Sequence, residues 1–332
     1  MRHFLKPSDL NAEERISVLN RARELKALTT PPTEQNLRVG GLYFNPSLRT
    51  RISWEQACWR LGASCQTINA GADSWKMEMD PHAVMDQDKQ ENIVEAAGVL
   101  GRYFHLLGVR SFPGTESWEV ERTEPTLSAM CQYAGVPIVS LEGAMHHPCQ
   151  SLADELTIHE HFGNPKGLPV ALVWAWHPNP LPMAVPQSFA LQSALTGCDL
   201  RIVRPDGYDL DPEVMDEIRA TGSEVTVTND RAEGLKGVKV AYVKSWGSMP
   251  LWGQTDAERE FRSGLRDWQF DRNTWNFTDE AKVMHCLPVR RNVVVSGEML
   301  ESEHSLIFDE AENRLWAQAA LIEHIAKQEG LI

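Results

Sequence analysis

The chain has 332 residues, of which 42% are hydrophobic and 23% are charged, an ordinary globular composition that excludes collagen-like and largely disordered proteins. Because a domain usually takes about 100–200 residues, the length predicts two domains. Lysine and arginine total 32 against 46 acidic residues, and the resulting net charge of −14 repels nucleic acid and anionic lipid. We therefore expect neither as a partner. We also expect a cytoplasmic protein, because the sequence has no signal-peptide core and no run of about 18 apolar residues.

The cysteines and glycines exclude several kinds of site. The 6 cysteines follow no repeated spacing, which argues against a disulfide framework or a zinc ribbon. Neither a GxGxxG turn nor a GxxxxGK[ST] loop occurs, which argues against dinucleotide and P-loop sites. Histidines, cysteines and carboxylates are not clustered at metal-ligand spacing. We therefore expect no metal and no cofactor.

Apolar runs bounded by turn residues predict strands, and several lack the polar alternation of half-exposed strands, so both faces of a sheet should be covered. The runs are 39–44, 104–109, 136–141, 168–176, 200–203, 238–243 and 282–286. Helical spacing lies between them, in Trp54 to Leu61 and in Ile93 to Leu100, and a long helix is predicted over 315–326. This alternation predicts parallel α/β units.

Two segments follow predicted strands where α/β folds bind ligands. Segment 45–51 opens a predicted helix and carries Ser47, Arg49, Thr50 and Arg51. Hydroxyls, guanidiniums and helix-start amides together bind phosphate. A lone SxRTR is equally compatible with a capped helix that bears surface arginines, but the strand–turn–helix context favours phosphate. The proline-rich segment 177–182 predicts an ordered loop at the carboxyl end of strand 168–176, where ligands also bind.

Five motifs occur in a fixed order: FNPSLRTR at 44–51, GVR at 108–110, HPCQ at 147–150, HCLP at 285–288 and ENR at 312–314. This order and spacing, spread over essentially the whole chain, resembles the aspartate/ornithine carbamoyltransferase family. The resemblance implies two doubly wound parallel-sheet α/β domains linked by helices. A domain at 1–146, completed by a C-terminal helix at 311–330, would bind carbamoyl phosphate, and 147–310 would bind the amine substrate. It also implies a homotrimer.

Carbamoyl transfer needs cations on a dianionic phosphate and donors on the carbonyl oxygen that a neutral amine attacks. The resemblance implies that carbamoyl phosphate is bound by Ser47, Leu48, Arg49, Thr50, Arg51, Trp75, Arg110, His147, Gln150, Cys286, Leu287 and Arg314. Arg110, His147, Gln150, Cys286 and Arg314 are the implied catalytic residues, and Leu287 would act through its backbone. Taken singly, His147 could cap a helix, Cys286 could be a small core residue and Arg314 could pair with Glu310 or Glu312. Leu48 departs from the Thr that often stands at its position.

The amine substrate is indicated by Lys244. Ordinary ornithine carbamoyltransferases carry an Asp near the corresponding Ser-Met-Gly loop, where it pairs with the substrate's α-ammonium. A lysine repels an α-ammonium but attracts the α-carboxylate of a substrate whose α-nitrogen is acylated. This argument predicts an N-acylated ornithine. Segments 84–88, 244–246, 285–292 and 310–314 accordingly resemble the N-acetylornithine and N-succinylornithine carbamoyltransferases. These relatives also imply a knot near the proline-rich loop of the C-terminal domain.

This closer resemblance implies acyl-ornithine contacts at Glu142, Lys244, Gln90 and Pro182. The resemblance also implies that Trp75 reaches the neighbouring subunit's phosphate site. Core packing is the alternative for Trp75, but its polar neighbours argue against a core strand. Gln90 stands at the position that selects the acyl group. An acid there leaves room only for acetyl, whereas a small uncharged residue admits succinyl. Since Gln has the bulk of the acid without its charge, N-acetyl-L-ornithine is narrowly favoured and N-succinyl-L-ornithine stays open. The product would be an N-acylcitrulline of arginine biosynthesis.

Two rival classes fit less well. A nicotinamide-dependent dehydrogenase needs a Gly-rich turn that the segment around Gly40 and Gly41 does not supply. A silent regulatory or scaffold paralogue should have lost its charged motifs, yet Arg49, Arg110 and Arg314 are all present. Active carbamoyl transfer is therefore the favoured interpretation.

Overall fold

The computed structural model describes residues 1–30, 33–114 and 116–332, which form two compact units. Unit 1 comprises Met1–Gly114, Glu119–Leu152 and Arg314–Ile332, and unit 2 consists mainly of Ala153–Asn313. The chain passes from one unit to the other within α6 (Pro148–Phe162) and within α13 (Ile307–Gln328). We describe each unit by itself.

Unit 1 is built on a parallel sheet with the strand order β2-β1-β5-β6. Its strands are β1 (Arg38–Tyr43), β2 (Ser64–Asn69), β5 (Leu106–Arg110) and β6 (Ile138–Glu142). The helices before α6 are α1 (Ala12–Ala27), α2 (Leu48–Arg60), α3 (Ile93–Tyr103), α4 (Trp118–Glu121) and α5 (Pro125–Tyr133), and a short 3-10 helix spans Pro7–Asp9. A separate ribbon pairs β3 (Met77–Glu78) with β4 (Glu91–Asn92). β1 lies inside the sheet, so the segment that follows it starts from a fixed position.

Helices cover both faces of this sheet. On one face α3 and α5 bury a cluster that includes Leu42, Leu107 and Ile138. On the other face Trp54 of α2 is fully buried, and its indole N–H donates to the Gly40 carbonyl at 3.2 Å. The Trp54 ring lies so close to β5 that a Cβ on Gly108 would fall 2.8 Å from it. Glycine at this position therefore allows α2 to sit directly on the sheet, which fixes the start of α2 at the carboxyl end of β1.

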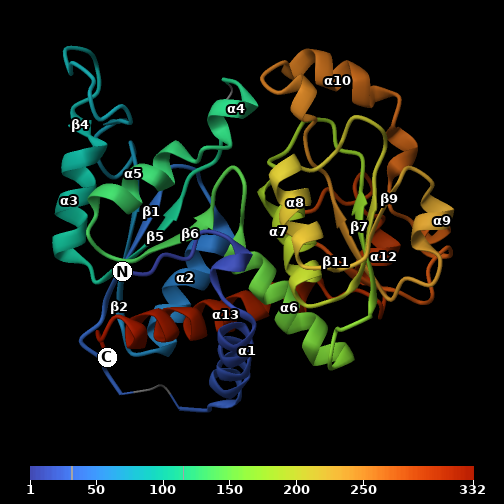
Figure 1. Ribbon diagram of the computed structural model, residues 1–332, viewed down its shortest axis with the longest axis horizontal. Helices are drawn as coiled ribbons and strands as arrows, with labels where there is room; N and C mark the ends of the chain where they lie inside the picture. The colour runs from blue at the N-terminus through green and yellow to red at the C-terminus, as the bar shows by residue number, and fades with distance from the viewer. Residues whose placement is uncertain (31–32, 115) are drawn as a thin grey trace. The chain divides into compact units, whose positions relative to one another are not determined.

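Unit 2, drawn from green to orange-red in Figure 1, is built on a second parallel sheet. Its strand order is β11-β10-β7-β8-β9. Its strands are β7 (Pro169–Trp174), β8 (Asp199–Val203), β9 (Val225–Thr228), β10 (Val240–Lys244) and β11 (Lys282–Met284). Its further helices are α7 (Ala184–Leu195), α8 (Pro212–Ala220), α9 (Arg231–Leu235), α10 (Thr255–Ser263), α11 (Arg272–Trp275) and α12 (Gly297–Glu301), with 3-10 helices at Met249–Leu251 and Arg266–Trp268. The strand order reverses between β7 and β10, and ligands bind outside the carboxyl ends of strands at such a switch point.

The predicted fold class is confirmed, since two parallel sheets alternate with helices along the chain. All seven predicted strands occur within about two residues of their observed bounds, and the predicted C-terminal helix at 315–326 lies within α13. The knot and the assignment of one substrate to 1–146 and the other to 147–310 stay predictions. Within the described residues, no helix is both long and apolar enough to cross a membrane.

Candidate functional site

The segment after β1 forms a capped helix start, as predicted. β1 ends at Tyr43 and α2 begins at Leu48, with Ser47 as the N-cap in extended conformation. The Ser47 hydroxyl accepts the backbone N–H of Thr50 at 3.2 Å. Asn45 secures the preceding turn, because its side-chain oxygen accepts the Phe112 N–H at 2.6 Å. The first turn of α2 is the predicted phosphate loop.

A buried polar cluster surrounds the Thr50 hydroxyl. Arg314 Nη2 donates to Thr50 Oγ1 at 2.7 Å, and Arg110 Nη1 donates to the same oxygen at 3.3 Å. Arg314 also contacts Gln150 Oε1 at 3.0 Å and His147 Nε2 at 2.6 Å. All five side chains belong to unit 1 and are at most 6% exposed. The structure therefore brings together the residues that the sequence predicts at positions 50, 110, 147, 150 and 314.

Glu142 supplies negative charge to this cluster. It ends β6, beside Arg110 at the end of β5, and its Oε2 forms a buried ion pair with Arg110 Nη1. The same oxygen lies 3.5 Å from His147 Nε2. Arg110 also stacks on Phe112, with its guanidinium carbon 4.4 Å from the ring centroid. Arg110 is thus held in place by contacts within the protein. Glu142, predicted as an acyl-ornithine contact, lies among residues predicted to bind carbamoyl phosphate.

Four further predicted residues lie at the surface of unit 1. Arg51 pairs with Glu55 one turn along α2, at 3.1 Å, and does not join the contacts around Thr50. Leu48, Trp75 and Gln90 are exposed, and Trp75 retains 62% of its surface. Core packing is therefore excluded for Trp75 within the chain. Arg49 is partly buried in the first turn of α2.

Unit 2 contributes a buried lysine at its switch point. Lys244, the last residue of β10, is 8% exposed, and among the described residues no carboxylate pairs with its ammonium group. His177 lies in the loop after β7, where Pro182 also lies, and its ring nitrogen contacts the Asn179 carbonyl at 2.7 Å. Burial lowers the pKa of His177, and Arg290, Lys244 and Arg262 lower it further through their charges. Lys244 and Arg290 thus place positive charge near His177, while the Arg262 guanidinium is paired with Glu258 at 2.7 Å. The charge of Lys244 suits an anionic ligand.

Sequence reasoning did not single out His177 as a site residue. The proline-rich loop was the available signal, because a histidine that opens an ordered loop at the end of a central strand is a candidate ligand residue. Arg262 was also missed, although it fixes the same loop. Its guanidinium is fully buried and donates to the carbonyls of His177, at 2.9 Å, and Trp246, at 3.0 Å. One arginine on α10 therefore holds both loops that flank Lys244.

The turn after β11 carries Cys286 and Leu287, both partly exposed. Leu287 has a left-handed backbone with φ 54°, precedes a cis proline, and donates its N–H to His285 Nδ1 at 2.8 Å. Glu310 holds the base of the turn by accepting the His285 N–H at 2.8 Å. Burial raises the pKa of Glu310 well above its usual range, and the adjacent Asp154 carboxyl raises it further. The turn that presents Cys286 is therefore tied to a buried glutamate that lies beside a second buried acid.

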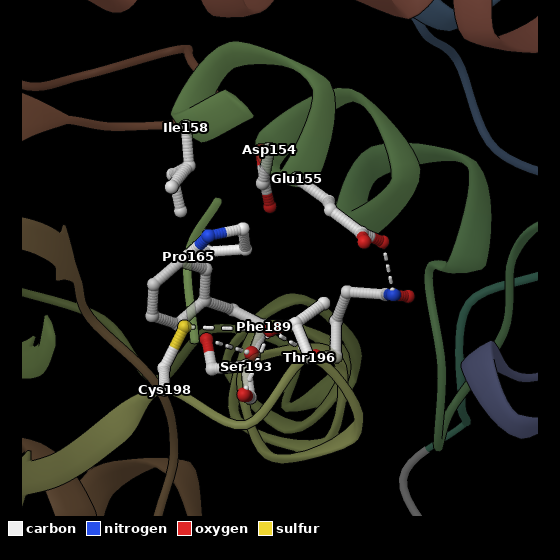
Figure 2. Close-up of a pocket in the computed structure, with 9 residues that line it drawn as sticks. Asp154, Glu155, Ile158, Pro165, Phe189, Ser193, Thr196 and Cys198 are labelled. Atoms are coloured by element: carbon white, nitrogen blue, oxygen red, sulfur yellow. Dashed lines mark hydrogen bonds between the residues drawn. The ribbon is translucent and has the colours of Figure 1, made fainter. Parts of the chain in front are cut away.

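Two cavities lie away from these residues. Figure 2 shows one between α6 and α7, where Asp154, Phe189, Cys198 and their neighbours enclose about 10 Å³. This volume holds at most one water molecule. The other, about 370 Å³, is lined by residues of β8, β9 and α8 such as Ile202, Arg204 and Met215. None of the predicted site residues lines either cavity. The described residues contain no cluster of three or more histidine, cysteine or acidic side chains suited to a metal ion.

The family is decided by two matches that cover nearly the whole chain. Residues 2–160 match the model of the aspartate/ornithine carbamoyltransferase carbamoyl-P binding domain, and residues 167–325 match that of the Asp/Orn binding domain. The chain belongs to the aspartate/ornithine carbamoyltransferase family. The resemblance inferred from the five motifs is confirmed.

Carbamoyltransferases specific for acylated ornithine are among the relatives of this family member. The N-acetylornithine carbamoyltransferase of Xanthomonas axonopodis pv. citri (strain 306) is 34% identical over 338 residues, covering 100% of this chain and 98% of the relative. The N-succinylornithine carbamoyltransferase of Bacteroides thetaiotaomicron is 37% identical, over 82% of each chain. A crystal structure of acetylornithine transcarbamylase complexed with acetylcitrulline superposes with a TM-score of 0.93 at 34% identity, over 97% of this chain and 98% of that one. The predicted subfamily is confirmed.

Proposed function

We propose that the protein transfers the carbamoyl group of carbamoyl phosphate to the δ-amino group of N-acetyl-L-ornithine, giving N-acetylcitrulline and phosphate. The observation that carries the proposal is the buried Lys244, whose ammonium group meets no carboxylate of the described residues. A buried cation without a counter-charge is costly, and the α-carboxylate of an acylated amino acid would compensate it. The full-length similarity to an N-acetylornithine carbamoyltransferase supports the same substrate.

Carbamoyl phosphate fits the cluster around Thr50. Arg110 and Arg314 converge on one hydroxyl at the start of α2, so guanidinium and helix-start donors are available to a dianionic phosphate. As the δ-amine attacks, negative charge grows on the carbonyl oxygen. Arg110 and His147 are the proposed donors to this oxygen. The C–O bond to phosphate then breaks, the phosphate leaves with the bonding electrons, and the attacking nitrogen loses a proton. Fixed donors need little rearrangement during these steps, which is where their catalytic benefit lies.

The remaining predicted contacts are part of the proposal. Ser47, Arg49 and the Cys286–Leu287 turn would complete the binding of carbamoyl phosphate. His177 would join Lys244 in binding the α-carboxylate, because both lie at the carboxyl ends of neighbouring strands. Gln90 and Pro182 would contact the acyl group.

Assembly as a homotrimer is also proposed. Leu48, Ile52 and Trp59 share one face of α2 and are all at least half exposed. Exposed apolar side chains grouped on one helix are typical of an interface. The exposed Trp75 would reach the phosphate-binding residues of a neighbouring copy.

One comparison tests the activity and its substrate. The protein is assayed for phosphate release with carbamoyl phosphate and, in turn, N-acetyl-L-ornithine, N-succinyl-L-ornithine and free ornithine. We expect kcat/KM for the acetylated substrate to exceed that for ornithine by at least ~100-fold, or ~2.7 kcal/mol. Equal values for acylated and free ornithine would refute the assignment.

N-succinyl-L-ornithine is the second candidate substrate. The similarity to a succinylornithine enzyme and the uncharged Gln90 favour it. A succinyl preference above ~100-fold in the same assay would replace acetyl by succinyl and leave the acyl-ornithine class intact.

A further inference from the structure

The turn between Glu142 and His147 lacks the regular hydrogen bonds of a strand or helix. Residues Gly143 to His146 connect the end of β6 to the start of α6. The Gly143 N–H donates to the His146 carbonyl at 2.9 Å, which closes the turn on itself. Both flanking side chains belong to the candidate site, because Glu142 pairs with Arg110 and His147 contacts Arg314. An element that fixes this turn therefore fixes two site residues.

Glu124 performs this role with its carboxylate. Its Oε2 accepts the Ala144 N–H at 2.9 Å and its Oε1 accepts the Met145 N–H at 2.7 Å. A backbone hydrogen bond from His146 also acts on this carboxyl group. Three consecutive N–H groups that point at one carboxylate form an anion-binding nest, here occupied by the protein's own side chain.

Two further features are built around this contact. Glu124 precedes α5 in a left-handed conformation, φ 53° and ψ 54°, which costs a non-glycine residue roughly 1 kcal/mol. Its side chain forms no cap on α5 and reaches the turn instead. The turn itself has no room for a side chain at Gly143, because a Cβ on this residue would fall 2.4 Å from the Glu124 carboxylate. The left-handed backbone of Glu124 and the absence of a side chain at Gly143 thus both allow the carboxylate to approach the turn.

We propose that Glu124 is a positioning residue for carbamoyl transfer, which acts by holding the 143–146 turn and thereby the orientation of His147. Burial and the nearby Glu121 raise the pKa of Glu124 to about 7, so the carboxylate is the dominant form at pH 8. The expected effect on kcat rests on the proposed function, whereas the expected effect on the 143–146 turn does not.

The test compares Glu124→Gln with Glu119→Gln, an exposed glutamate of the neighbouring α4, at pH 8. The amide group of the substituted side chain would present N–H donors to backbone N–H donors, so one contact is lost. We expect kcat to fall about 10-fold or more, the scale of one charge-assisted hydrogen bond, while KM for N-acetyl-L-ornithine stays within about twofold. Amide hydrogen exchange at residues 144–146 should accelerate in the Glu124→Gln protein, whereas β7, far along the chain, keeps its protection. Glu119→Gln should match the parent protein in both measurements.

A double-mutant cycle makes the assignment specific. Gly143→Ala should displace the carboxylate and reproduce the loss in kcat, and it should have little further effect in a Glu124→Ala background. Unchanged exchange at 144–146 in Glu124→Gln, or additive effects in the cycle, would overturn the proposal. If the parent protein transfers no carbamoyl group, the proposed function fails, while the exchange measurement still decides whether Glu124 holds the turn.

Discussion

At the scale of a single residue, Lys244 is proposed to separate acylated from free ornithine. Replacing it, Lys244→Gln, removes a buried positive charge that would face the substrate's α-carboxylate. We expect kcat/KM for N-acetyl-L-ornithine to fall by about 100-fold or more, in line with the loss of a desolvated charge pair, and that for free ornithine to fall much less. The matched control is Lys239→Gln, since Lys239 lies just before β10 but is partly exposed and pairs with Asp279. An equal loss for both substrates would contradict the assigned role.

The proposed role of Gln90 in selecting the acyl group belongs to the same scale. Gln90→Glu adds a negative charge of nearly the same volume, so it should suppress turnover of N-succinyl-L-ornithine selectively, because the second carboxylate is then repelled. Gln90→Ala should raise turnover of that substrate by removing bulk. Steady-state kcat/KM for the two acyl-ornithines measures both effects. Gln87→Glu, a neighbouring exposed change, should leave the ratio unaltered.

The sequence predicts some site residues better than others, for a physical reason. The role proposed for Lys244 could be predicted from the sequence, because the positive charge of a lysine attracts a carboxylate and repels an ammonium group. Thr50, Arg110 and Arg314 follow from motif order. Glu124, by contrast, contacts residues about 20 positions away in the chain, and from the sequence an acid before Pro125 indicates no more than a helix start. Nearly every residue has a backbone N–H group, so a contact to such groups requires no particular residue type and cannot be predicted from the sequence.

At the scale of elements, the helix start at Ser47 links stability to phosphate binding. Ser47→Ala removes the acceptor for the Thr50 N–H, so the free energy of unfolding should fall by about 1 kcal/mol. Because the same turn is the proposed phosphate loop, KM for carbamoyl phosphate should also rise. Chemical denaturation and initial rates measure the two effects.

Ser53 provides the control for this prediction. It lies on the same helix, and its hydroxyl donates to the Thr50 carbonyl within the helix rather than capping it. Ser53→Ala should therefore change both quantities little. A stability loss in Ser47→Ala without any change in KM would show that the cap is structural only.

The strands differ in how clearly their own sequence predicts them. Central strands such as β5 and β10 are buried along their whole length and read as continuous apolar runs. β2 and β9 are edge strands with polar residues and partial exposure, and no apolar run marks them. Their place follows from pairing with a neighbour, in register from Arg38 to Tyr43 for β2, which is a property of the sheet and not of the segment.

At the scale of the whole molecule, shared active sites should allow complementation. Trp75→Ala removes the side chain that is proposed to reach a neighbour, and Arg49→Ala removes a proposed phosphate ligand of the subunit's own site. Each variant alone should have little activity. A co-assembled mixture should regain part of the parent activity, because some sites then combine an intact Trp75 with an intact Arg49. Size-exclusion chromatography with light scattering, alongside the assay, confirms that the variants assemble. Absence of any recovery in assembled mixtures would contradict the shared site.

The hydrogen bond between Arg314 and Thr50 spans 264 positions of the chain. A ribosome that adds about 5–20 residues per second reaches Arg314 roughly 13–50 seconds after Thr50 has been made. The helix start at Ser47 and its sheet can form early, but the polar cluster that would hold phosphate stays incomplete until α13 has left the ribosome. Nascent chains should therefore acquire helical and sheet structure well before they can bind carbamoyl phosphate, and binding should begin only after α13 has emerged from the ribosome.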